Sequence, residues 1–115
     1  MPRRWVRAQF PADIGGGTYT DAGDIVRAAW TPGVHIVIAD LTATVSWTTA
    51  SLHSLRRAHR DLASQGTELR MVVWSSELYT ALQATGVTPP VLVFANLESA
   101  VRAPAGRRFH KNSRG

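Results

Sequence analysis

Strand-length apolar runs alternate with helix-length patterns along these 115 residues, and this alternation limits the folds open to the chain. Residues 34–41 form a nearly continuous apolar run, as expected for a strand that is covered on both faces. Shorter strands are predicted at 5–10, 69–74 and 91–94. Because helical patterns separate these strands, the sequence predicts βαβ units and a mostly parallel sheet flanked by helices.

Helix start signals mark the segments between the strands. Asp21 is predicted to cap the first helix, Thr48 opens the second, Ser75 precedes the third and Asn96 caps a short last helix. Apolar residues of the second helix recur at helical spacing, which places Leu55 on its buried face.

The chain length suits a single hydrophobic core, and we expect one domain over residues 1–103. Residues 1–101 hold eight arginines and eight acidic residues, so the whole formal charge of +5 lies in residues 102–115. We interpret residues 104–115 as a flexible basic tail, a solvated end with no specific binding of nucleic acid expected.

Several classes of protein lack support in the sequence. No run of about 20 apolar residues could span a membrane, and no cysteine is present, so we expect a soluble cytoplasmic chain without thiolate chemistry. The four histidines lack metal-ligand spacing, and we expect neither a metal nor a cofactor. Phosphate-loop, receiver and hydrolase motifs are incomplete, so the sequence predicts a protein that is not an enzyme.

A hydroxyl-rich turn joins the apolar strand at 34–41 to the second helix. A helix N-terminus carries unpaired N–H groups and a partial positive charge, so hydroxyls placed there can carry a phosphate. From the residues alone, Thr48 and Thr49 fit simple N-caps as well as phosphate acceptors.

The chain carries four motifs in a fixed order: Asp40-Leu-Thr42, Trp47-Thr-Thr-Ala50, an arginine-rich helix over 52–60 and Ala84-Thr-Gly86. This order resembles the STAS domain of bacterial anti-sigma factor antagonists, over roughly residues 8–103. The resemblance implies an α/β, STAS-like fold, with a four- to five-stranded, mostly parallel mixed sheet and helices packed mainly on one face.

The resemblance also implies a function in partner switching. In such proteins an anti-sigma factor serine/threonine kinase phosphorylates a Ser or Thr at the start of the second helix, and the unmodified form binds that kinase to release a sigma factor. By position the phosphoacceptor would be Thr49, with Thr48 second. The expected partner-binding residues cluster around this turn: Thr44, Ser46, Trp47, Thr48, Thr49, Ala50, Ser51, His53 and Arg57.

The chain departs from the family pattern around the acceptor. Trp47 stands where an acid is usual and Ala50 where a glycine is usual. The acid of the loop after the first strand is either lost among residues 15–17 or supplied by Asp13. Trp47 fits an interface anchor or a core residue. Three alternatives therefore stay open: a switch that works without an acid, a constitutive binder, or a small-ligand or nucleotide-sensing STAS-like domain with a decayed phospho-switch.

Overall fold

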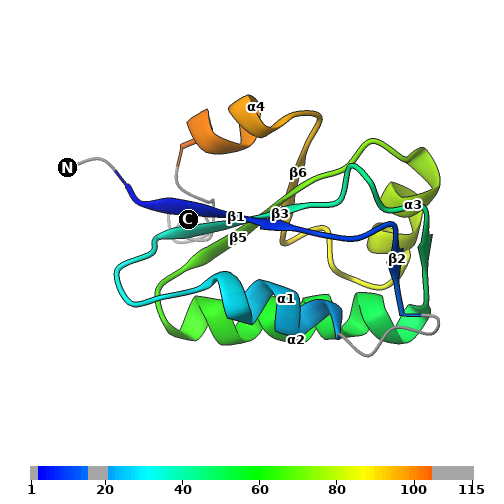
Figure 1. Cartoon of the computed structure of the whole chain (residues 1–115), viewed down its shortest axis with the longest axis horizontal. Helices are drawn as coiled ribbons and strands as arrows, with labels where there is room; N and C mark the ends of the chain where they lie inside the picture. The colour runs from blue at the N-terminus through cyan, green and yellow to red at the C-terminus, as the bar shows by residue number, and fades with distance from the viewer. Residues whose placement is uncertain (1–2, 16–20, 105–115) are drawn as a thin grey trace, which may run out of the picture.

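A four-stranded parallel sheet forms the centre of the computed structural model, which describes residues 3–15 and 21–104 (Figure 1). The strand order is β1-β3-β5-β6, and all three pairings are parallel. The strands are β1 (Trp5–Gln9), β3 (Ile36–Asp40), β5 (Glu68–Val72) and β6 (Leu92–Phe94). The predicted parallel sheet is confirmed. The resemblance implied a mostly parallel mixed sheet, and every described strand of this sheet pairs in parallel.

Four helices cover this sheet: α1 (Ala22–Ala29), α2 (Thr49–Ser64), α3 (Ser76–Ala84) and α4 (Leu97–Arg102). Strands are added in one direction across the sheet, so right-handed crossovers place the three connecting helices on the same face. Figure 1 shows α1 and α2 below the sheet and α4 above it. The expected packing of helices mainly on one face is confirmed.

The two faces of β3 explain its continuous apolar run. Val37 and Ala39 belong to the large core between the sheet and helices α1 and α2, whereas Ile36 and Ile38 pack with Ala100 of α4. Both faces of the strand are therefore removed from water, and all five residues are buried.

Side-chain caps begin all four described helices. Each N-cap side chain accepts a hydrogen bond from a backbone N–H two or three residues later; the caps are Asp21, Thr48, Ser75 and Asn96. These are the predicted helix starts. Leu55 is fully buried on α2, as its spacing predicts.

A second, two-stranded sheet was not predicted. It pairs β2 (Asp13–Ile14) in parallel with β4 (Ser46–Trp47), which ties the loop after β1 to the turn before α2. Two-residue strands carry no periodic pattern, so this pairing arises only once the main sheet has brought the two loops together. The rest of the predicted glycine loop, beyond Gly15, lies outside the described residues.

The buried Arg70 fastens the end of the described chain. Its guanidinium donates to the carbonyl oxygens of Ala100, Ala103 and Pro104 at 2.6 to 2.8 Å. It also pairs with both carboxylate oxygens of Glu68 at 3.1 Å. The tail was predicted to begin at residue 104, but the Pro104 carbonyl is bound to Arg70 of the fold. The rest of the predicted tail, residues 105–115, lies outside the described part of the chain.

Within the described residues, no helix combines the length and apolar character that crossing a membrane requires.

Candidate functional site

The candidate site begins where the chain leaves β3 at the carboxyl end of the sheet. Asp40 is only 5% exposed, and its Oδ1 accepts hydrogen bonds from the backbone N–H and the hydroxyl of Thr42 at 3.0 and 2.7 Å. Its Oδ2 accepts from the Arg7 guanidinium at 2.9 Å. Burial alone would raise the pKa of Asp40, but the hydrogen bonds from Thr42 and Arg7 outweigh it and hold that pKa below its usual value. An ionised Asp40 therefore fixes the direction in which the turn departs.

Thr44 holds the middle of the turn from inside the fold. It is 2% exposed, and its hydroxyl donates to the Pro11 carbonyl at 2.9 Å. The backbone N–H groups of Val45 and Ser46 both donate to the Ala12 carbonyl. Thr44 was expected among the partner contacts, but its side chain is buried and positions the turn.

Reciprocal hydrogen bonds close the start of α2. The Thr48 hydroxyl accepts from the Ser51 N–H at 3.1 Å, and the Ser51 hydroxyl accepts from the Thr48 N–H at 3.1 Å. This is a capping box, so the Thr48 oxygen already serves the helix end. Ser51 is buried in this arrangement and, like Thr44, is removed from the expected contact surface.

Thr49 follows as the first residue of α2, and it is exposed to solvent. The structure thus gives these two neighbouring threonines different surroundings. Thr48 caps the helix, and Thr49 presents its side chain at the positive end of the helix.

Gly15 brings the backbone of the loop after β1 against this cap. Its φ is +120°, and a Cβ at this position would lie 2.6 Å from the Thr48 hydroxyl oxygen. Only a residue without a side chain fits there, in a backbone conformation that favours glycine. The loop and the capping box are therefore packed as one unit.

Asp13 supplies a carboxylate beside the turn. It pairs with Ser46 in the two-stranded sheet, and its Oδ1 accepts from the Ser46 hydroxyl at 2.7 Å. In the same register Ile14 lies opposite Trp47. Asp13 therefore lies beside Ser46 of the turn, in a register that the sequence alone did not give.

Apolar exposure at the turn comes from Val45 more than from Trp47. Trp47 is half-buried and packs against the large core, so part of its ring is structural. Val45 is 75% exposed and was not among the predicted contact residues. On the neighbouring loop after β5, Trp74 is 71% exposed while its indole N–H donates to the Ala95 carbonyl at 2.7 Å.

A helix face continues the site away from the turn. Thr49, His53 and Arg57 are spaced four residues apart on α2, which places them along one side of the helix. We call the following set the α2 N-terminal surface: Val45, Ser46, Trp47, Thr49, Ala50, His53 and Arg57. Each member is exposed or half-buried, so the surface is accessible. Among the described residues, no group of three histidine or acidic side chains could hold a metal ion.

A parallel sheet with three helices on one face, and a capped turn that presents Thr49 at the surface, define a small α/β domain. The chain belongs to the STAS domain family, whose model matches residues 7–100. STAS domains are generally non-enzymatic modules. The comparison with curated proteins found no match.

Proposed function

We propose that this chain is an anti-sigma factor antagonist-like module that binds an anti-sigma factor serine/threonine kinase through the α2 N-terminal surface. Phosphorylation of Thr49 would release the kinase, and both partners would act in the cytoplasm. The observation that carries the proposal is that two adjacent threonines, Thr48 and Thr49, have different positions at the start of α2. Both threonines are exposed, but the Thr48 hydroxyl is engaged in the capping box, and Thr49 is at the position that the family resemblance assigns to the acceptor.

The chemistry of the switch follows from charge. A phosphate adds about −1.5 to −2 charges at neutral pH. At the first residue of a helix this charge meets the positive end of the helix dipole, so the folded domain tolerates it. A partner that covers Thr49 would have to desolvate the phosphate or would be repelled by it. Phosphorylation would therefore weaken binding and leave the stability of the free domain nearly unchanged.

Asp13 supports this reading of the turn. The family pattern has acids near the acceptor, and Trp47 has replaced one of them. The Asp13 carboxylate, bound to the Ser46 hydroxyl beside Trp47, retains an acid at the turn. The replacement of the other acid by Trp47, with Val45 exposed nearby, adds apolar contact area to the same surface.

Nucleotide sensing has less support. The pocket between the C-terminal ends of α1 and α2 is lined by Asp61 as well as Arg27. Helix C-termini carry partial negative charge and disfavour a phosphate. A rise in melting temperature on adding ATP or GTP, without a kinase present, would favour the sensor over the antagonist.

The decisive experiment is calorimetric titration of the chain with the candidate kinase. We expect Thr49→Glu to keep the wild-type melting temperature and to weaken binding by about 1–3 kcal/mol, or about 5- to 150-fold. Ser99→Glu is the matched control, because Ser99 is also exposed in the first turn of a helix, but on α4 across the sheet. Wild-type affinity of a folded Thr49→Glu variant would rule out this turn as the regulated contact.

Phosphorylation itself needs a separate test. Incubation with the kinase and ATP, followed by mass spectrometry, should place the phosphate on Thr49 in the wild type and remove it in Thr49→Val. Modification that persists in Thr49→Val and disappears in Thr48→Val would assign the acceptor to the capping residue instead.

A further inference from the structure

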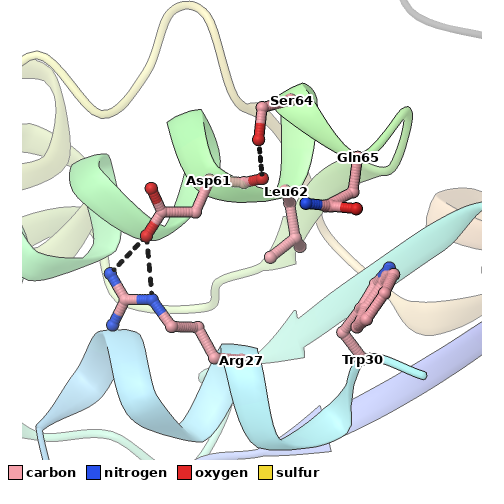
Figure 2. Close-up of a pocket in the computed structure, with 6 residues that line it drawn as sticks. All are labelled: Arg27, Trp30, Asp61, Leu62, Ser64 and Gln65. Atoms are coloured by element: carbon pink, nitrogen blue, oxygen red, sulfur yellow. Dashed lines mark hydrogen bonds and ion pairs between the residues drawn. The ribbon is translucent and has the colours of Figure 1, made fainter. Parts of the chain in front are cut away.

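A pocket of about 480 Å³ lies between the C-terminal ends of α1 and α2 (Figure 2). Its lining residues are Arg27, Trp30, Asp61, Leu62, Ser64 and Gln65. At a rise of about 1.5 Å per residue, its lining residues on α2 are roughly 18 to 24 Å along the helix from Thr49. The pocket is therefore separate from the α2 N-terminal surface and is open to an independent ligand.

Two charged side chains line this pocket, Arg27 and Asp61, and Asp24 pairs with Arg27 from outside the lining. Arg27 lies between two carboxylates, with its guanidinium 3.1 Å from Asp24 and 2.9 Å from Asp61. Both acids remain largely exposed, so each keeps oxygen lone pairs available to a further donor. Arg27 and Asp61 balance each other in the lining, and Asp24 beside them gives the three-residue cluster one formal negative charge.

The helix ends add to this potential. Trp30 is the C-cap of α1 and Gln65 is the C-cap of α2, so the negative ends of both helix dipoles meet at the pocket. The last turn of α2 carries no basic residue of its own. An external cation would therefore be stabilised here.

Trp30 provides a fixed aromatic wall. Its indole N–H donates to the Thr67 hydroxyl at 2.8 Å, and the buried Thr67 hydroxyl donates in turn to the Val34 carbonyl at 2.9 Å. Figure 2 shows the indole standing across the pocket from Leu62 and Gln65 on α2. Because the ring is already ordered, a ligand that packs on it loses little further side-chain entropy.

We propose that this pocket binds the side chain of an arginine presented by a segment of a partner protein. A guanidinium is planar and weakly hydrated, so it can pack against the Trp30 ring while it donates to the Asp61 carboxylate. The methylenes of the arginine would cover Leu62. A lysine ammonium fits less well, because it is a compact and strongly hydrated charge.

An NMR titration of the ¹⁵N-labelled chain tests the proposal with three probes: acetyl-arginine amide, its neutral isostere acetyl-citrulline amide, and free L-arginine. We expect acetyl-arginine amide to shift the Trp30 indole N–H and the backbone signals of residues 61–67. We expect its affinity to be at least about fivefold higher than that of acetyl-citrulline amide.

Two variants and a control assign the contacts. Asp61→Asn and Trp30→Leu should each weaken binding of acetyl-arginine amide about fivefold. Glu98→Gln removes an exposed carboxylate from α4, which is paired there with Arg102, and should leave binding unchanged. Asp61 is largely exposed, so Asp61→Asn keeps the test valid even if Trp30→Leu fails to fold.

Three results would overturn the proposal. Equal affinity for the citrulline probe would show that charge plays no part, and an unaffected Asp61→Asn variant would remove the proposed partner of the guanidinium. Tighter binding of free L-arginine than of the blocked residue would assign the pocket to a small molecule instead of a protein segment. None of these outcomes bears on Thr49, so the proposed kinase contact stands or falls separately.

Discussion

Replacing Arg70 by methionine should destabilise this domain more than any surface change of the same size. Arg70 has no exposed side-chain area, and its five described hydrogen bonds go to three backbone carbonyls and to both oxygens of Glu68. Its guanidinium also lies 6.0 Å from the centre of the Phe94 ring. Methionine fills part of the volume but can donate to none of these acceptors.

The magnitude follows from what the substitution leaves behind. Glu68 is only 15% exposed, so Arg70→Met removes the arginine partner of a mostly buried carboxylate and the donor to three carbonyls at the end of α4. Breaking a buried ion pair by removing one partner costs about 3–5 kcal/mol. For a domain of this length that loss corresponds to a fall in melting temperature of roughly 12–20 °C.

Denaturant unfolding of three variants measures the effect. Arg57→Met, on the exposed face of α2, is the control and should stay within about 0.5 kcal/mol of wild type. Adding Glu68→Gln to Arg70→Met should recover about 1–2 kcal/mol of the lost stability, because the side chain at position 68 is then neutral. If Arg70→Met loses less than about 1 kcal/mol, or the double variant is no more stable than the single, the buried ion pair does not stabilise the position of α4.

Three further predictions test the core and the turn. The pKa of Asp40 is lower in the folded than in the unfolded protein, so ionised Asp40 stabilises the fold above the unfolded pKa of about 3.9, and this stabilisation is lost as the pH falls through the folded pKa. Asp40→Asn should therefore lose less stability than wild type when the pH is lowered through that range. Equal loss of stability in the two proteins would contradict a role for the Asp40 carboxylate. Leu55→Ala should cost about 2–5 kcal/mol by chemical denaturation while Arg57→Ala stays near zero, and equal small effects would mean that the buried face of α2 is misassigned. Gly15→Ala should cost at least about 1–3 kcal/mol and shift the NMR signals at the start of α2, whereas an unperturbed spectrum would show that the loop does not pack on the cap.

Local sequence signals were sufficient where a structural feature depends on neighbours in the chain. The apolar strand at 34–41 and the helix starts at Asp21, Thr48 and Asn96 could be predicted, because strand burial and capping are visible in the residue pattern. Leu55 could be placed for the same reason, since helical spacing alone determines its face.

Features that depend on distant contacts could not be predicted. Arg70 sits in an apolar strand and would be expected at the surface, but α4 folds back to supply carbonyl acceptors from residues 30 to 34 positions away. Thr44 was placed among the partner contacts because the resemblance puts the contact surface around this turn. Its burial follows from an acceptor 33 positions away, the Pro11 carbonyl, which only the folded turn brings close. Ser51 was placed there for the same reason, although its hydroxyl bonds locally to Thr48.

The proposed switch need not change the fold, because the threonine that caps α2, Thr48, is not the proposed phosphate acceptor, Thr49. Phosphate on Thr48 would occupy the oxygen that receives the Ser51 N–H and would disturb the start of α2 and the loop at Gly15. Phosphate on Thr49 leaves that capping box in place and changes mainly the charge of the surface. Because Trp47 stands where the family pattern has an acid, a phosphate on Thr49 would add its charge beside one carboxylate fewer than that pattern places there. A switch built in this way alters the partner's affinity without altering the fold, so its signature is a loss of binding at constant melting temperature.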